Sequence, residues 1–199
     1  NCLVKRSKLK NNPLINTSKL KIDQADITFL EFQEIKSLLN ILRNSNNQDA
    51  EIIVKTCLST GARWSEVQNL GRNQVGADHI QFSGTKSTKS RLVKIAKSLS
   101  NEILNGRPKR GRLFRPAYNS VSSCIVKAGI ELPKGQRTHV FRHSFAVHFM
   151  RDRGNILDLQ KILGHETISM TLRYAQFHPD YLEDAAIRNP IAQMQRELK

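Results

Sequence analysis

The stretch LGHETISMTLRYAQF, residues 163–177, places one histidine and one tyrosine nine positions apart. On a single unbroken helix, nine steps of ~100° would put His165 and Tyr174 on opposite faces. Gly164, however, is a residue type that commonly ends a helix, and Thr167 is a favoured cap for the start of the next helix. With a helix break between them, the two side chains can face one pocket, so the stretch predicts a shared site.

The composition of the chain predicts an anionic partner. Its 199 residues suffice for one domain with a real core. Lys and Arg number 32 against 17 Asp and Glu, which gives a formal net charge of +15 and a pI of about 10.1. Such a positive field needs an anionic macromolecule or surface. No apolar run approaches the ~20 residues that span a bilayer, and no signal peptide is visible, so nucleic acid is expected and a membrane is not.

The cysteines predict a reducing compartment and no metal site. Cys2, Cys57 and Cys124 are far apart and lack metal-ligand spacing. So sparse a set is typical of cytoplasmic proteins. Cys57 and Cys124 are expected to be small buried side chains. The sequence also lacks paired carboxylates and Cys/His pairs at the spacing that binds a catalytic metal. No metal is therefore expected.

Apolar periodicity predicts a mostly α chain with one small antiparallel β-hairpin, which is an α+β fold. The hairpin consists of HIQF at 79–82 and RLVKI at 91–95, with a basic turn between them. Thr28 and Glu31 fit a capping box at the start of the first helix. Further helices are expected at about 48–60, 64–70, 98–105, 117–128, 138–152, 155–163, 167–175, 179–187 and 190–198.

The charge pattern divides the chain into an arm, a main domain and a tail. Residues 1–22 are basic without any acid and predict a linker or extended arm. Residues 23–187 are expected to form the main domain, and 188–199 a terminal helix. That helix has an apolar stripe that must be buried, on its own domain or on a neighbouring protomer. The stripe comprises Ile187, Ile191, Met194 and Leu198.

Two consecutive basic segments suggest a surface that follows phosphates. Residues 83–101 and 103–130 contain Lys and Arg but no acid. A single charge run is usually a solvated face. Two in sequence, together with a basic N-terminal arm, favour contact with a nucleic-acid backbone.

Two of the four motifs that carry candidate chemistry lie in the first half of the chain. TGARWSEVQNL, residues 60–70, places Arg63 just after a helix-ending glycine, and Glu66 three residues later. TKSTKSRLVKI, residues 85–95, is the basic hairpin, with Lys86 and Lys89 at its turn.

The other two motifs lie in the second half. HVFRHSF, residues 139–145, puts His139 and Arg142 on neighbouring faces of one helix, with His143 near His139 by the same spacing. Read alone, such a pair is more often a surface His and Arg beside a core helix. The fourth motif is the opening stretch with His165 and Tyr174.

In order and type, the four motifs resemble the catalytic domain of the tyrosine recombinases, the phage-integrase family, over about residues 25–185. The family pattern is T-G-x-R-x-x-E, a lysine in a hairpin turn, H-x-x-R, and L-G-H followed nine residues later by the nucleophilic tyrosine. The segment after the tyrosine, YAQFHPDYLEDA, is similar to that of integrases of temperate bacteriophages. By this resemblance the catalytic residues are Arg63, Lys86, His139, Arg142, His165 and Tyr174.

The roles implied by the resemblance agree with the chemistry of these side chains. The planar guanidinium groups of Arg63 and Arg142 suit bidentate contact with the phosphate oxygens that gain negative charge in the transition state. In other enzymes metal ions stabilise this charge. Tyr174, whose phenol has an ordinary pKa of ~10, must lose its proton as it attacks. The remaining roles are a base (His139), a hydrogen-bond donor to the phosphoryl group (His165) and an acid for the leaving 5′ oxygen (Lys86).

Some assignments have rivals within the sequence. Lys89 competes with Lys86 in the same turn. Tyr118 and Tyr181 compete with Tyr174, but Tyr118 lacks the L-G-H partner and Tyr181 lies among acids, which is unfavourable opposite phosphate. Glu66 is expected to brace a neighbouring helix and not to react.

The resemblance implies site-specific DNA strand exchange through a 3′-phosphotyrosine, with no cofactor, for the integration or excision of phage or mobile-element DNA. Two alternatives are a non-catalytic DNA-binding protein and a type IB topoisomerase. The implied partner is double-stranded DNA, bound by a homo-tetramer that exchanges its tails, with a monomer or weak oligomer in isolation. Accessory DNA-bending and excision proteins are expected, as is a separate N-terminal DNA-binding domain that is not visible in these residues.

Overall fold

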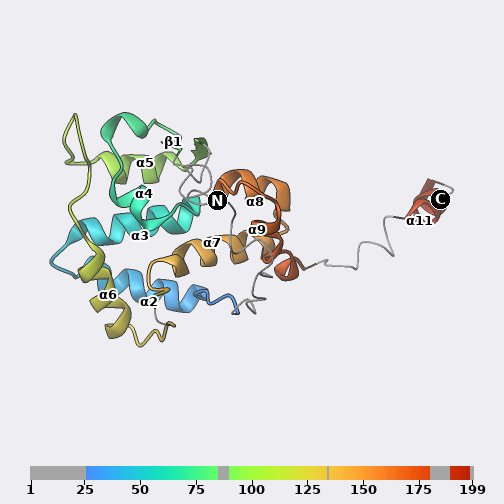
Figure 1. Cartoon of the computed structure of the whole chain (residues 1–199), viewed down its shortest axis with the longest axis horizontal. Coiled ribbons are helices and arrows are strands. Elements are labelled where there is room, and N and C mark those ends of the chain that lie inside the picture. Colours follow the sequence, from blue (N-terminus) through green and yellow to red (C-terminus); the bar gives the residue numbers. More distant parts are fainter. Residues whose placement is uncertain (1–25, 85–89, 134, 180–188, 198–199) are drawn as a thin grey trace, which may run out of the picture.

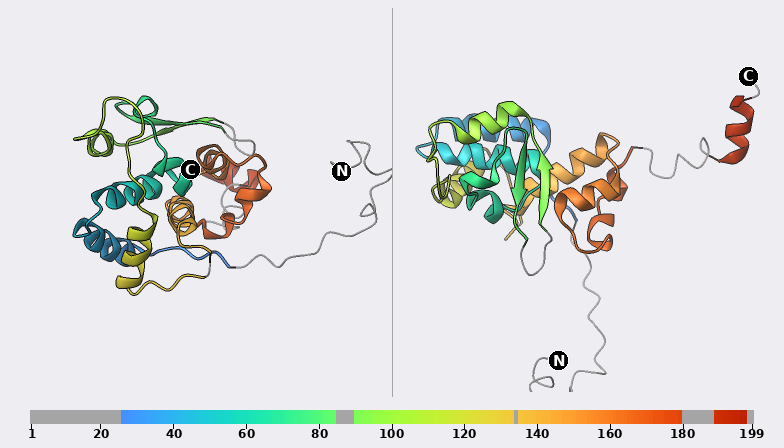
Figure 2. Two further views of the ribbon diagram at one scale, coloured as in Figure 1. Left: turned by 60° about the vertical axis from the view of Figure 1, so that its left-hand side comes forward. Right: turned by 90° about the horizontal axis from the view of Figure 1, so that it is seen from above.

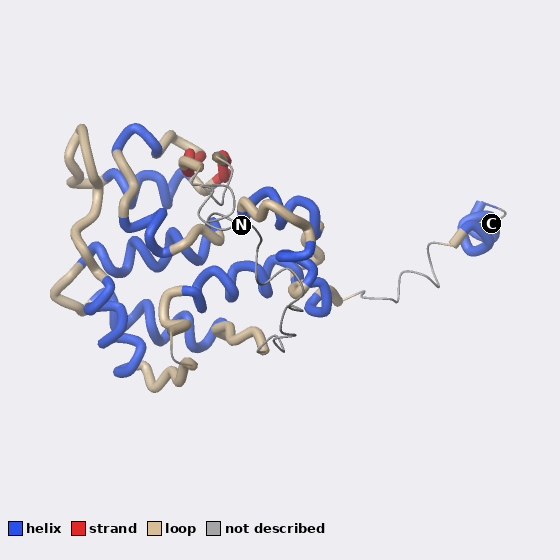
Figure 3. The backbone as a smooth tube through the Cα atoms, viewed as in Figure 1, coloured by secondary structure: helices blue, strands red, loops and turns tan. Residues whose placement is uncertain are grey.

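The computed structural model describes residues 26–84, 90–133, 135–179 and 189–197, and it confirms the predicted α+β class (Figures 1 and 3). The described elements are α2 Phe32–Arg43, α3 Gln48–Thr60, α4 Trp64–Gln68, η1 Arg72–Gln74, β1 His79–Phe82, β2 Arg91–Lys94, α5 Lys97–Leu104, α6 Tyr118–Lys127, α7 His139–Arg151, α8 Ile156–Leu163, α9 Ser169–Leu172, η2 Ala175–Phe177 and α11 Pro190–Glu197. None of these helices is long and apolar enough to cross a bilayer.

The core consists of two clusters that meet along α7. The larger cluster gathers side chains from α2, α3, α4, the hairpin, α5 and α6, and it contains Cys57 and Cys124, which are buried as predicted. The smaller cluster lies between the second half of α7 and the segments α8, α9 and η2. It consists of Ala146, Val147, Met150, Leu159, Leu163 and Tyr174. The residues of the opening stretch are therefore packed against the helix that carries the H-x-x-R motif.

The first helix begins later than predicted. Glu31, and not Thr28, is the N-cap of α2, and the Glu34 carboxylate accepts the backbone N–H of Glu31 over 2.8 Å. The segment before it is held by α7 instead: the N–H of Leu30 donates to Ser144 Oγ over 2.8 Å. Because this long-range bond fixes the chain in a non-helical conformation, it overrides the local capping signal of Thr28.

The hairpin forms where it is predicted. β1 and β2 pair antiparallel with Ile80 opposite Val93 and Phe82 opposite Arg91. The alternation of a strand turns these four side chains toward the interior. β2 also runs beside α8, which connects the hairpin to the opening stretch (Figure 2). The turn with Lys86 and Lys89 lies outside the described residues.

The predicted break in the opening stretch is present. α8 ends at Gly164 with a left-handed φ of 68°, and the N–H of His165 bonds the carbonyl of Gln160 over 3.1 Å, as in a Schellman motif. The next helix, α9, is shorter than predicted, and its N-cap is Ile168, not Thr167. Tyr174 follows α9 and precedes η2. The predicted helix at 179–187 falls almost entirely outside the described residues, while the one at 190–198 is α11.

Candidate active site

Arg142 joins the ends of two helices that are far apart in the sequence. Its Nη1 donates to the carbonyl of Gly61 and its Nη2 to the carbonyl of Leu163, both over 2.9 Å. These two carbonyls lie at the carboxyl ends of α3 and α8. Helix carboxyl ends carry unpaired carbonyls and partial negative charge, so a guanidinium suits them. Arg142 thereby holds the segment of Arg63 close to the segment of His165.

The guanidinium of Arg142 remains available for a further anion. Arg142 is only 5% exposed. Burial lowers its pKa to about 10, with a smaller contribution from the charges of Arg63 and Arg91, so it stays charged at neutral pH. A guanidinium has five N–H groups, of which two bind the carbonyls, leaving three.

Arg63 follows a sharp turn that requires glycine. A Cβ on Gly61 would lie 2.5 Å from a ring carbon of Phe145 and 2.6 Å from a methyl carbon of Leu163, and its φ of 62° is left-handed. Glycine therefore permits both the turn and the close packing. Arg63 then becomes the N-cap of α4, and its side chain is 29% exposed. Its head group can reach a ligand from solvent.

Glu66 holds the hairpin in place, whereas the sequence predicted that it would brace a neighbouring helix. Its two carboxylate oxygens accept bonds from Arg91 Nη1 and Nη2 over 2.9 and 2.8 Å, and Arg91 Nε donates to the carbonyl of Ile162 over 2.7 Å. Burial alone would raise the pKa of Glu66, but the bonds and charge of Arg91 outweigh it and keep that pKa below its usual value. This buried pair connects α4, β2 and the end of α8 around the site.

His165 is oriented by a buried hydroxyl. Its Nδ1 lies 2.8 Å from Thr171 Oγ1 on α9. Burial lowers the pKa of His165 to about 4, and the charges of Arg142, Arg63 and Arg91 lower it further in the same direction. The ring is therefore neutral at neutral pH. If Thr171 donates to Nδ1, the proton of the ring sits on Nε2 and can be donated to a ligand.

Tyr174 is enclosed by protein, and its hydroxyl binds His143, which is not among the six predicted catalytic residues. It is 2% exposed, and its Oη lies 2.7 Å from Nδ1 of His143 on α7. Burial raises the pKa of the Tyr174 phenol, against the charges of Arg142 and Arg173, which lower it. The phenol is thus protonated at neutral pH and already has a hydrogen-bond partner.

His139, the predicted base, lies one helical turn away from His143. The two rings are 6.4 Å apart between centroids, and the His139 ring is exposed. Burial and the charges of Arg142 and Arg63 lower the pKa of His139. Within the described part of the chain it makes no hydrogen bond to Tyr174.

Five of the six predicted residues lie close to one another, around the charge of Arg142. They are Arg63, His139, Arg142, His165 and Tyr174. Arg142 acts electrostatically on the rings of His139, His165 and Tyr174, and Arg63 acts on the two histidines. The sixth residue, Lys86, lies outside the described ranges. No group of three or more His, Cys, Asp or Glu that could hold a metal occurs among the described residues.

Sequence reasoning missed His143 and Arg91. Arg91 belongs to one of the basic runs, but the alternation of RLVKI places it on the same face of the strand as the buried Val93. This alternation could have indicated that Arg91 is buried. The spacing placed His143 beside His139, but nothing in the sequence linked it to Tyr174, which is 31 positions away.

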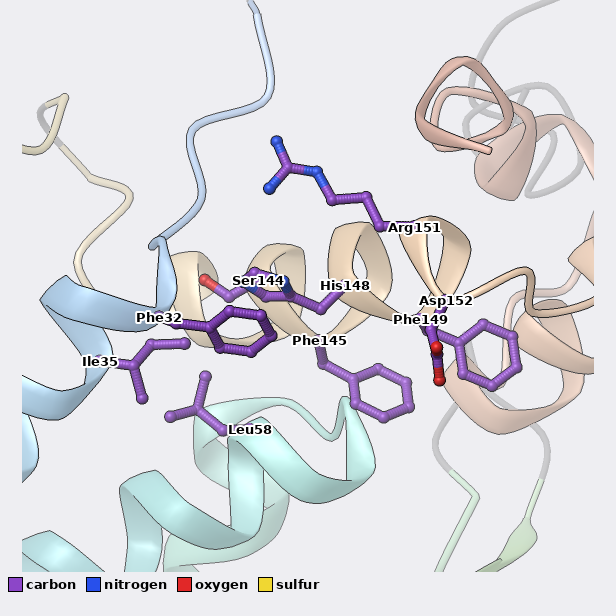
Figure 4. A pocket seen from close by; sticks show the side chains of 9 residues that line it. All are labelled: Phe32, Ile35, Leu58, Ser144, Phe145, His148, Phe149, Arg151 and Asp152. Atoms are coloured by element: carbon purple, nitrogen blue, oxygen red, sulfur yellow. The ribbon is translucent and has the colours of Figure 1, made fainter. Parts of the chain in front are cut away.

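One hollow in the described structure lies apart from this site. It has a volume of about 680 Å³ and lies between α2, α3 and α7 (Figure 4). His148, at the centre of its lining from α7, comes nine positions after His139 and therefore lies on the opposite face of the helix at ~100° per residue. The ring of His148 stacks on Phe32 there at 4.3 Å between centroids. The hollow is therefore centred on the side of α7 away from His139.

Comparison with known proteins gives the family of the chain. The model of the phage integrase family matches residues 28–180. The chain belongs to the phage integrase family. The resemblance that the four motifs predicted is therefore confirmed.

Two relatives of this phage integrase family member are integrases of bacteriophages. The integrase of Haemophilus phage HP1 is 49% identical over 91% of this chain, and that of Escherichia phage 186 is 44% identical over 90%. The chain covers 53% of each relative, so it spans about half of their length. The catalytic domain of the HP1 integrase superimposes with a TM-score of 0.77 at 50% identity, over 84% of this chain and 98% of that one.

The two half-buried histidines His143 and His165 predict a loss of stability in mild acid. His143 and His165 both have pKa values of about 4, chiefly because of burial, against 6.5 in an unfolded chain. The unfolded state therefore binds more protons between pH 6.5 and 4, and the folded state becomes less stable as pH falls through that window. The urea midpoint should decrease from pH 7 to pH 5. A variant with His143→Gln and His165→Gln should show a flatter profile, and an unchanged slope would contradict the assignment.

Proposed function

We propose that this chain is the catalytic domain of a site-specific DNA recombinase that cuts and rejoins DNA through a covalent 3′-phosphotyrosine. The observation that carries the proposal is the position of Arg142. It binds the helix ends beside Arg63 and His165, and its charge acts on Tyr174. Cations converging on a phenol are what attack on a phosphodiester requires.

In this proposal the protein supplies the charge stabilisation that a metal supplies in other nucleases. Arg63 and Arg142 donate to the non-bridging oxygens of the phosphate, and His165 donates from Nε2 while Thr171 holds its ring. Oη of Tyr174 attacks phosphorus, and the 5′ oxygen leaves. Lys86, or Lys89 in the same turn, protonates that oxygen.

The proposed partner is double-stranded DNA in the cytoplasm of a bacterial host. The recombinase XerH, solved with its difH substrate, shares the fold at a TM-score of 0.63, which supports a DNA partner for the scaffold. The charge of +15 fits such a partner. The reaction integrates or excises phage or mobile-element DNA on a homo-tetramer, with DNA-bending and excision proteins as accessories.

We also propose that the tail helix packs on another protomer in the tetramer. Ile191 and Met194 on α11 are 63% and 59% exposed, so this face has no apolar cover within the described structure. Two exposed apolar side chains at this spacing favour docking in a groove of a neighbour.

Deleting residues 188–199 should change recombination more than folding. We expect the free energy of unfolding to stay within ~0.5 kcal/mol of the parent, because the exposed side chains of α11 contribute no packing. Strand exchange by the full-length protein should fall at least tenfold. Arg196→Lys, on the side of α11 opposite to Ile191 and Met194, is the control and should change neither quantity. Loss of folding on truncation would instead indicate that the tail packs within its own domain.

The proposed function is tested by incubating the protein with supercoiled plasmid in EDTA and quenching with SDS. Relaxed plasmid and protein-linked DNA are expected. A non-catalytic DNA-binding protein would produce neither product, although the retention of Tyr174 and His165 at family spacing does not favour it. A topoisomerase would relax the plasmid but would not join two DNA sites, which a two-plasmid assay detects.

A further inference from the structure

His143 is the histidine that touches the reacting atom. Its Nδ1 lies 2.7 Å from Oη of Tyr174, within the range of a direct hydrogen bond, and the two rings are 6.0 Å apart between centroids. His139 makes no such bond in the described structure. The pair joins α7 to the segment between α9 and η2, so it positions the phenol and also gives its proton a destination.

We propose that His143, and not His139, accepts the phenolic proton of Tyr174 when the nucleophile attacks DNA. This inference rests on the proposed function and assigns one step of it. A candidate base must lie within hydrogen-bond reach of the proton that it removes, either directly or through one water. His143 meets this condition directly, and it does so before DNA is bound.

The titratable and charged groups that face His143 disfavour protonation of its ring. They are Arg142 and His139 on α7 and Arg173 at the end of α9. Burial, followed by these charges, lowers the pKa of His143 to about 4, so the ring is neutral at neutral pH. A neutral ring that carries its proton on Nε2 presents a lone pair at Nδ1, which accepts the O–H of Tyr174.

Binding of the substrate would raise the basicity of His143. A phosphodiester seated between Arg63 and Arg142 brings negative charge that offsets the cations near the ring. The pKa of His143 then moves up toward the working pH, where a general base is most effective. The free enzyme keeps a protonated, poorly nucleophilic phenol, and the phosphate itself activates it.

The step is balanced in protons and bonds. The O–H bond of Tyr174 breaks and its proton passes to Nδ1 of His143, while the bond from Oη to phosphorus forms. The bond from phosphorus to the 5′ oxygen breaks, and this oxygen takes a proton from the acid assigned to Lys86. In rejoining, the 5′ hydroxyl attacks phosphorus and gives its proton to the deprotonated group assigned to Lys86, while the bond from Oη to phosphorus breaks and His143 returns its proton to Oη.

The kinetic test compares His143→Ala and His139→Ala in the rate of adduct formation on supercoiled plasmid in EDTA. Removal of a general base typically costs 10²–10⁴-fold, so His143→Ala should fall by ~10²-fold or more. Added imidazole should restore at least tenfold of that loss, because it can occupy the vacated space and accept the proton. Circular dichroism and plasmid binding report folding, and His143→Gln serves as a second variant should the alanine variant be unstable.

Several outcomes would overturn the assignment. One is a His143→Ala rate within threefold of the parent. Another is imidazole rescue of His139→Ala alone. A third is a loss of adduct rate in both His143 variants while folding and DNA binding stay intact, if imidazole does not restore the rate and the pH profile of the remaining rate is unchanged. That result would give His143 a merely structural role.

A spectroscopic measurement separates this inference from the proposed function. Nitrogen-15 NMR of the histidine rings should show the Nε2–H form of His143, with an Nδ1 resonance that moves in Tyr174→Phe. An Nδ1–H form, or a resonance indifferent to Tyr174→Phe, contradicts the inference without any DNA present. Absence of adduct from the parent protein, by contrast, contradicts the proposed function.

Discussion

Tyr174→Phe is expected to abolish the covalent adduct between protein and DNA while leaving the domain folded. Phenylalanine keeps the ring that packs in the cluster with Leu159 and Leu163, and it removes only the oxygen that would bond to phosphorus. The variant leaves His143 without its partner, at a stability cost of about 1 kcal/mol. DNA binding should persist, because the arginines are untouched. The measurement is SDS-resistant adduct on plasmid, together with thermal unfolding and a binding isotherm.

Two other tyrosines provide matched controls. Tyr118→Phe changes an exposed residue at the start of α6, and Tyr181→Phe changes a residue outside the described ranges. Both should form adduct at the parental rate. Adduct from Tyr174→Phe, or its loss in either control alone, would move the nucleophile to another tyrosine.

Glu66→Ala is expected to destabilise the domain by about 3–5 kcal/mol, since it leaves a buried guanidinium without its counter-ion. The side chains of Arg91 and Glu66 are only 6% and 10% exposed, and they make a bidentate pair. Arg91 also sits over the Phe82 ring and against Gly164, so its guanidinium is packed between the hairpin and the end of α8. Urea unfolding measures the loss.

A double variant distinguishes an unpaired charge from a loss of packing. Glu66→Ala combined with Arg91→Met should recover a large part of the stability, because it removes the charge and keeps an apolar side chain of similar length. Lys94→Ala on the same strand breaks an exposed ion pair with Asp78 and should leave the urea midpoint unchanged. A Glu66→Ala midpoint equal to that of Lys94→Ala would mean that the buried pair contributes little.

Local signals in the sequence predicted the fold where one residue type decides the geometry. Gly164 ends α8 in the left-handed region, as glycine does, so the break before Tyr174 was predictable. Thr28 and Thr167 are favoured cap residues, but the N-caps of α2 and α9 are Glu31 and Ile168. For α2, the bond from the N–H of Leu30 to Ser144 on α7 explains the later start. Tertiary contacts of this kind cannot be predicted from the periodicity of the sequence.

The same distinction applies to the site. The resemblance of the four motifs to the phage-integrase family predicts that Arg63, Arg142, His165 and Tyr174 act together. The contact between His143 and Tyr174 joins segments that only the folded chain brings together. The charge of Arg91 suggested a surface position, whereas its place in the strand indicated a buried one. The structure shows that Arg91 is buried.

The central claim is that Tyr174 attacks DNA without a metal, and peptide mapping of the adduct tests it most directly. The adduct formed in EDTA is digested with nuclease and trypsin, and the linked nucleotide is located by fragmentation in the mass spectrometer. Cleavage after Arg173 yields a peptide with both Tyr174 and Tyr181, so fragment ions must separate the two. A 3′-linked nucleotide on Tyr174 is the predicted result. A nucleotide on Tyr181 or on any other residue, or an adduct that forms only when metal is added, would contradict the account.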